Sequence, residues 1–199
     1  MDKVSLNNQQ VVAKLHYLAM FCYKQVAVYN KHPAPDVSFK RLKDKMAMST
    51  PTVDRTNTVG YTKRYPSEEL HSAVNAFLGA MKLSTDTANW YVSEIAVQPK
   101  KWGWTAWNNS HLKKRKFIRF IYNRGTGVTH WVGNGEIKKI PDQHRGKDWT
   151  VLAGSMEGTQ WLADRNTGLE HPRFIFEISI PAKNLHEWEA AKEVIRNVQ

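Results

Sequence analysis

Polar side chains that could act on a phosphoester gather in the segment 130–148. His130, Glu136, Asp142 and His144 offer imidazole and carboxylate groups there, and such groups can bind a metal ion or move a proton. Beside a basic surface they are what a metal-assisted hydrolase of nucleic acid or nucleotides requires. The sequence therefore keeps a metal-dependent enzyme as one alternative, with these four residues as its candidate catalytic groups.

The spacing of these residues matches no closed metal-ligand signature. Glu136-Ile137-Lys138 resembles the Glu-x-Lys element of restriction-type nucleases, but no aspartate stands between Asp86 and Asp142 to complete that site. The chain has no P-loop and no dinucleotide-binding glycine pattern. Its single cysteine, Cys22, cannot form a thiolate zinc cluster. We therefore expect no cofactor and no metal, and the question of catalysis stays open.

A second group of residues has a composition typical of nucleic-acid binding. The stretch PKKWGWTAWNNSHLKKR (99–115) sets three tryptophans between two clusters of cations. Proteins that hold single strands combine cations for the phosphates with aromatic rings on which bases stack. On a strand, Trp102 and Trp104 would share one face and Trp107 the other. The predicted binding residues are Lys100, Lys101, Trp102, Trp104, Trp107, Lys113, Lys114, Arg115, Lys116, Arg119 and Arg124.

The distribution of charge favours the same part of the chain. Of a formal net charge of +11, residues 1–94 contribute +4, residues 95–139 contribute +9 and residues 140–199 contribute −2. A segment of one sign suggests an anionic partner, because like charges repel unless something compensates them. Nucleic acid is the expected partner, either DNA or RNA, single-stranded or duplex. An interaction or inhibitor module that binds an acidic protein is a further alternative, and so is a solvated basic face.

Helical spacing appears at both ends of the chain. Apolar residues three and four apart predict a helix over the first 30 residues, with Asn7 or Asn8 as its cap. A short helix is expected from Ser38, and the segment 49–66 is expected to be a long loop. A third helix should begin after Pro66, and a last one at Asn184, with Leu185, Trp188, Ala191, Ile195 and Val198 as its buried stripe.

Strand patterns occupy the middle of the chain. We predict about five strands among the segments 90–97, 116–122, 128–132, 136–140, 149–153 and 173–180. The NRGTG turn at 123–127 should join its flanking strands as an antiparallel hairpin.

These elements together predict a single α+β domain over residues 1–199. A helical N-terminal third would pack on a mostly antiparallel sheet of about five strands, followed by a C-terminal helix. No apolar run reaches the length of about 18 residues needed to cross a bilayer, and the start of the chain is polar. We therefore expect a cytoplasmic protein with no membrane partner.

Overall fold

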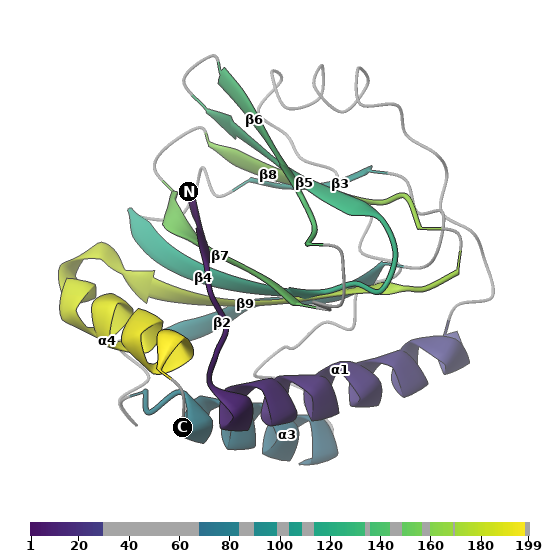
Figure 1. Ribbon diagram of the computed structural model, residues 1–199, viewed down its shortest axis with the longest axis horizontal. Helices are drawn as coiled ribbons and strands as arrows, with labels where there is room; N and C mark the ends of the chain where they lie inside the picture. The colour runs from purple at the N-terminus through teal and green to yellow at the C-terminus, as the bar shows by residue number, and fades with distance from the viewer. Residues whose placement is uncertain are drawn as a thin grey trace.

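Helices and two antiparallel sheets make up the protein, which we describe from a computed structural model (Figure 1). The structure describes residues 1–29, 68–83, 90–98, 104–108, 114–133, 136–143, 149–156, 160–168 and 170–197. The α+β class is confirmed, with helices near both ends of the chain and antiparallel strands between them.

The first sheet carries the helices and holds the centre of the fold. Its strand order is β1 (Asp2–Val4), β7 (Trp149–Met156), β4 (Arg115–Tyr122), β9 (Arg173–Pro181) and β2 (Tyr91–Gln98). Every neighbouring pair is antiparallel. Strand β4 lies in the middle with both faces buried, and five of its eight residues are apolar.

The second sheet has the order β3 (Trp104–Asn108), β8 (Trp161–Asn166), β5 (Gly127–Gly133) and β6 (Glu136–Pro141). The predicted hairpin of β4 and β5 is wrong, because the two strands belong to different sheets. The chain crosses from one sheet to the other at residues 123–126, whereas β5 and β6 do pair directly. The sequence also missed β1, β3 and β8.

The helices lie on the face of the first sheet that points away from the second (Figure 1). They are α1 (Gln9–Tyr29) and α3 (Glu68–Ala80), followed near the C-terminus by a 3-10 turn (Ala182–Asn184) and α4 (Leu185–Arg196). Asn8 caps α1, since its Oδ1 accepts hydrogen bonds from the backbone N–H groups of Gln10 and Val11 at 3.0 and 3.1 Å. The predicted helix from Ser38 and loop 49–66 lie outside the described residues.

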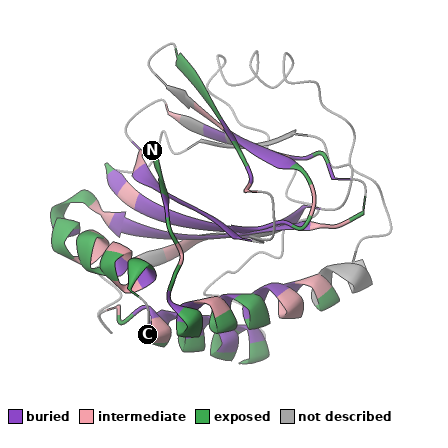
Figure 2. Ribbon diagram, viewed as in Figure 1, coloured by how far each residue is buried: buried purple, intermediate pink, exposed green. Residues whose placement is uncertain are grey.

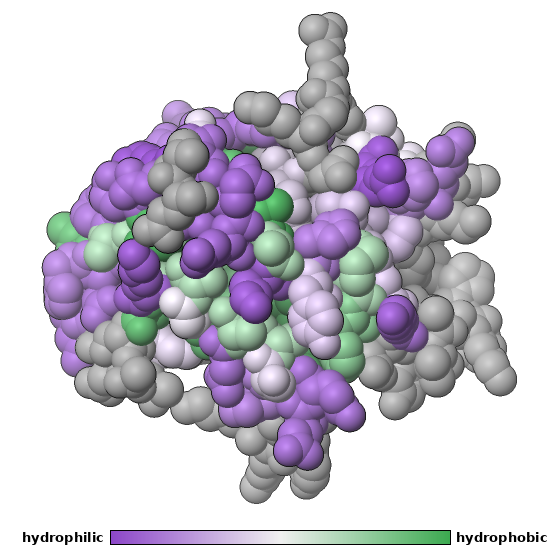
Figure 3. Space-filling view, turned by 60° about the horizontal axis from the view of Figure 1, so that its bottom comes forward, coloured by the Kyte–Doolittle hydropathy of each residue, from purple (hydrophilic) through white to green (hydrophobic). Residues whose placement is uncertain are grey.

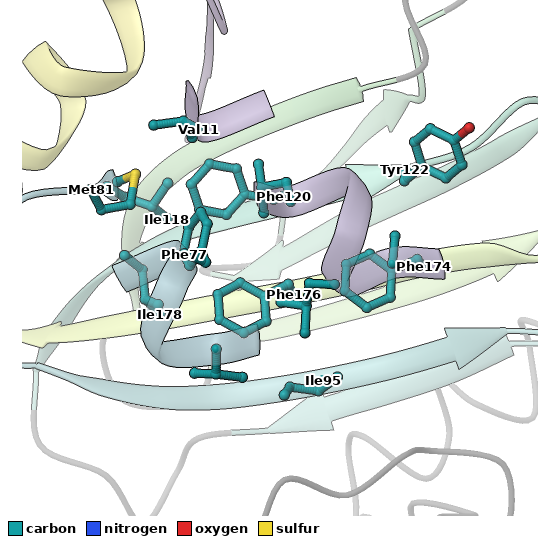
Figure 4. Close-up of a cluster of buried hydrophobic side chains, with 14 of the residues drawn as sticks. Val11, Phe77, Met81, Ile95, Ile118, Phe120, Tyr122, Phe174, Phe176 and Ile178 are labelled. Atoms are coloured by element: carbon teal, nitrogen blue, oxygen red, sulfur yellow. The ribbon is translucent and has the colours of Figure 1, made fainter. Parts of the chain in front are cut away.

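Aromatic rings fill the layer between the helices and the first sheet (Figure 4). Phe77 of α3 meets Phe120 and Phe176 edge-on, with ring centroids 5.2 and 5.0 Å apart. Edge-to-face pairs of this kind contribute about 0.5–1.5 kcal/mol beyond the burial of their area. The alternating side chains that face the helices from β4 and β9 are all fully or nearly fully buried: Ile118, Phe120, Tyr122, Phe174, Phe176 and Ile178.

Helix α4 packs on the same layer with a narrower stripe than its sequence predicts. Ala191 and Ile195 are buried as expected. Leu185, expected in the stripe, is 48% exposed because it stands at the first helical position, directly after the 3-10 turn. Asn184 precedes the helix, but its side chain makes no capping hydrogen bond.

Burial follows the layers closely (Figure 2), with buried residues along the strands of the first sheet and on the helix sides that face it. Seen from the helix side, hydrophilic side chains occupy most of the described face, around a smaller group of apolar ones (Figure 3). Among the described helices, none has both the length and the apolar character that a membrane crossing requires.

Gly127 begins β5 at a point where no side chain fits. A Cβ atom there would overlap the Asp142 carboxylate and would lie 2.6 Å from Nδ2 of Asn123 and 3.0 Å from Cδ of Arg173. We expect Gly127→Ala to lower the free energy of unfolding by about 1–3 kcal/mol, the usual cost of overpacking. Urea denaturation measures the loss.

Gly79 supplies the matched control, since a Cβ added there meets nothing within 4 Å. Gly79→Ala in α3 should leave stability unchanged or raise it by up to about 1 kcal/mol, because alanine favours helix. Equal unfolding curves for Gly127→Ala and the unchanged protein would contradict the close packing around Gly127.

Candidate nucleic-acid interface

A network of buried ion pairs lies between the two sheets, and it includes two of the predicted binding residues. Arg119 of β4 donates from Nε to Oε2 of Glu177 on β9 at 2.8 Å, and its Nη1 contacts the Asp164 carboxylate on β8. Arg115 donates to Oε1 of Glu177 at 2.9 Å. All four side chains are buried, so Arg115 and Arg119 face carboxylates inside the protein.

Arg173 extends this network to the start of β5 and the end of β6. It holds Asp142 with two bonds of 2.9 Å, one from Nε and one from Nη2. Its Nη1 donates to Asp164 and to Gln98, each at 3.0 Å, and Nη2 also donates to Thr129 at 2.8 Å. Asp142, a candidate catalytic residue, is therefore engaged in the interior and 3% exposed.

The arginines keep the buried acids ionised. Burial by itself would raise the pKa of Glu177, but the guanidinium groups of Arg115 and Arg119 hold that pKa below its ordinary value. Burial opposes ionisation of Asp164 too, and Arg119 with Arg173 lowers its pKa. The network is thus a set of paired charges: three arginines against three carboxylates.

This pairing changes where the net charge of the protein lies. Three cations and three acids cancel inside, so the whole formal charge of +11 belongs to the remaining residues. It also shortens the predicted basic segment, since two of its ten cations serve as internal counterions of acids that come later in the chain.

The other described cations among the predicted binding residues lie at opposite ends of β4. Lys114 is exposed just before the strand, and Arg124 is exposed just after it. A strand of eight residues separates them by about 25 Å. Lys116 is half-buried, with Nζ 5.1 Å from the ring centroid of Trp188. These cations do not form one continuous cluster.

The tryptophan-rich stretch is only partly placed. Lys100, Lys101, Trp102 and Lys113 lie outside the described residues. Strand β3 carries the other two tryptophans, with Trp104 at the register position opposite Arg165 and Trp107 opposite Leu162. The three-residue spacing puts these two positions on opposite faces of the strand, as the sequence predicts.

The candidate catalytic residues are not brought together where they are described. His130 is half-buried and pairs in register with Lys139, whereas Glu136 pairs with Gly133 and so has the opposite orientation in the sheet. Burial lowers the pKa of His130, and nearby Lys139 lowers it further. His144 lies outside the described residues, and no metal-binding group of three His, Cys, Asp or Glu occurs within them.

Cations that the sequence analysis did not select gather where the outer strands of the two sheets approach each other. Lys3 of β1 and Lys138 and Lys139 of β6 are exposed and line one hollow of about 470 Å³. Lys138 and Lys139 were within the basic segment, but no signal marked the three-residue strand that brings Lys3 beside them. We call this place, lined by residues 1–3 and 138–141, the edge hollow.

Comparison with known proteins adds no relative. No protein-family model matches the chain, and no curated protein matches it significantly.

The ion network makes stability depend on pH. The folded pKa values of Asp164 and Glu177 lie below their ordinary values of 3.8 and 4.5, so the unfolded chain takes up these protons first. The stability that these two carboxylates contribute should therefore be complete above about pH 6. The free energy of unfolding should fall as the pH drops through both ordinary values, by up to about 1.4 kcal/mol per pH unit for each carboxylate. Urea unfolding between pH 7 and pH 2.5 measures this.

Exposed carboxylates provide the comparison. The double variant Glu68→Gln/Glu69→Gln, on the exposed start of α3, should keep the same acid dependence. A free energy of unfolding that stays constant down to pH 3 would show that the buried carboxylates are not held ionised by the arginines.

Proposed function

We propose that this protein binds nucleic acid through its cationic exterior, with tryptophan side chains as stacking platforms for bases. The observation that carries the proposal is the internal neutrality of the ion network, which leaves a charge of +11 for the rest of the chain. A polyphosphate compensates such a charge, and its binding releases condensed counterions. We propose a cytoplasmic location for this binding, on the sequence grounds given above.

The tryptophans with described side chains pack in the protein and are left out of the proposed platform. Trp149 is buried against Tyr122 and Phe174, with ring centroids 5.0 and 6.3 Å away. Trp90 and Trp188 pack on the helix-side core, and Trp131 packs on a small cluster between the sheets. Four of the eight tryptophans thus serve packing, and the predicted platform consists of three of the other four: Trp102, Trp104 and Trp107.

Trp188 illustrates why an aromatic ring in a basic setting need not bind bases. The ammonium groups of Lys192 and Lys116 lie 3.6 and 5.1 Å from its ring centroid. Its indole N–H donates to the Phe117 carbonyl at 3.2 Å. This ring fastens α4 to β4 by cation–π contacts and a hydrogen bond, so it is not part of the proposed platform.

Charge reversal tests the location of the binding surface. We expect Lys100→Glu/Lys101→Glu/Lys114→Glu to weaken binding to an oligonucleotide more than tenfold, for all base sequences alike. Log affinity against log salt should be linear, with a slope of about −0.7 per contacted phosphate for a single strand. Fluorescence anisotropy at several salt concentrations measures both quantities. Arg115 is left unchanged, because a carboxylate there would stand beside buried Glu177.

The control makes the same charge change on the helix side. Lys14, Lys24 and Lys82 are exposed on or directly after α1 and α3. Reversal of all three to glutamate should reduce affinity much less. Equal losses from the two triple variants would mean that net charge alone attracts the nucleic acid.

Tryptophan emission separates stacking from simple attraction of a polyanion. Titration with an oligonucleotide should quench the emission, whereas heparin, which has no bases, should change it little. Trp102→Ala, Trp104→Ala or Trp107→Ala should each cost about 1–3 kcal/mol of binding if the ring stacks on a base. Trp149→Ala, the control, should instead cost about 3–5 kcal/mol of folding stability.

Stability measurements decide the result. Should all three alanine variants lose folding stability as Trp149→Ala does, and still bind normally when folded, the rings are core and the stacking platform is ruled out. Equal quenching by heparin and oligonucleotide would exclude it as well.

A further inference from the structure

The edge hollow lies where each sheet ends. Strand β1 is an outer strand of the first sheet and β6 is an outer strand of the second, and the hollow opens between them. Figure 1 shows β1 running along the edge of the first sheet, from the N-terminus toward α1. The volume of about 470 Å³ is ample for a phosphate group together with its hydration shell.

Two lysines bridge the hollow in opposite directions. Lys3 Nζ on β1 donates to the Pro141 carbonyl on β6, and Lys138 Nζ on β6 donates to the Met1 carbonyl beside β1, each at 3.0 Å. An ammonium group has three N–H donors, so each lysine keeps two for a further acceptor. The reciprocal bonds hold both charges in place before any ligand arrives, which reduces the entropy lost on binding.

The base of the hollow is well packed. Ile140, which lines it, is 6% exposed and belongs to a cluster with Ile121, Leu152 and Ile175. Met1 is partly buried against the same cluster. The lysines therefore project from backbone that is fixed by core packing.

The charges that line the hollow favour an anion. Lys3 and Lys138 supply the two positive charges that bond across it, and Asp2 is the one carboxylate among its described lining residues. Lys139 also lines the hollow, but its register position opposite His130 puts it on the other face of β6 from Lys138. Glu136 is exposed two residues further along β6 and does not line it. Lysine binds phosphate as a compact point charge with several donors, without the planar geometry that arginine imposes.

We propose that the edge hollow is a phosphate-binding site, with the ammonium groups of Lys3 and Lys138 as its ligands. The phosphate belongs either to a nucleic-acid backbone or to a free phosphate or mononucleotide. The site does not depend on the proposed nucleic-acid function, because inorganic phosphate is enough to occupy it.

Titration with inorganic phosphate tests the site directly. The protein, with any purification tag at its C-terminus, is labelled with nitrogen-15 and titrated at constant ionic strength with chloride as the compensating anion. Backbone amide signals of residues 2, 3 and 138–140 should shift and saturate. Shifts that stay linear, or that chloride reproduces, would overturn the proposal.

Variants assign the effect to the lysines. Lys3→Gln/Lys138→Gln removes two charges but keeps an N–H donor at each position, so the bridge between the strands can persist. The phosphate Kd should rise about tenfold, the equivalent of about 1.4 kcal/mol. Lys14→Gln/Lys82→Gln, the same charge change on the helix side, should leave the Kd unchanged. Lys139 lies on the opposite face of β6 from Lys138, so Lys139→Gln should raise the Kd much less than the double variant does.

A single variant keeps the result decisive. If Lys3→Gln/Lys138→Gln unfolds, Lys138→Gln alone carries the test, and an unchanged Kd there would overturn the proposed ligand set. Addition of an oligonucleotide then identifies the source of the phosphate. Displacement of inorganic phosphate assigns the hollow to the nucleic-acid backbone, whereas simultaneous binding assigns it to a free phosphate or mononucleotide.

Discussion

The contact between the two sheets depends on Arg119 and Arg173, which are fully buried and share the Asp164 carboxylate. Each arginine also holds a second acid, Glu177 for Arg119 and Asp142 for Arg173. Removing charges from water costs several kcal/mol per ion, so a network of this kind adds little net stability relative to apolar packing. Loss of one partner is different, because it leaves an uncompensated charge and costs about 3–5 kcal/mol. We infer that the network contributes more to specifying one arrangement of the sheets than to the net stability of the folded state.

The same network explains which strands could be predicted from the sequence. Strands β2, β4, β7 and β9 were found because they are rich in apolar and β-branched residues on at least one face. Strand β8 (WLADRN) was missed, because Asp164 and Asn166 point into the protein where an apolar pattern is expected.

The β4–β5 hairpin was predicted wrongly for a related reason. Glycine and asparagine at 123–127 mark a turn, but the hydrogen bond from Asn123 to Asp142 ties that turn to the second sheet, and no local pattern contains this information.

The candidate site was harder to predict than the fold, because charge along a sequence does not say which side of a strand it occupies. Arg115 and Arg119 looked like surface cations, yet both lie on the face of β4 that meets the second sheet. Their spacing of four residues puts them on one face of a strand, and β9 carries Glu177 directly opposite Arg119. A glutamate at the centre of the apolar run RFIFEISI was the available signal. Its meaning becomes clear only once β4 and β9 are known to be neighbours.

Neutralisation of the interior also determines where an anionic partner can bind. Every acid in the network is matched by an arginine, so the described residues between the sheets offer no excess charge to a phosphate. The cations that remain within the described residues stand at strand ends, on helix surfaces and on the outer strands β1 and β6. Lysines on outer strands already have one function, since they discourage pairing with another sheet. At the edge hollow the same lysines bond across the two sheets at fixed positions, and this arrangement distinguishes an anion site from a merely solvated edge.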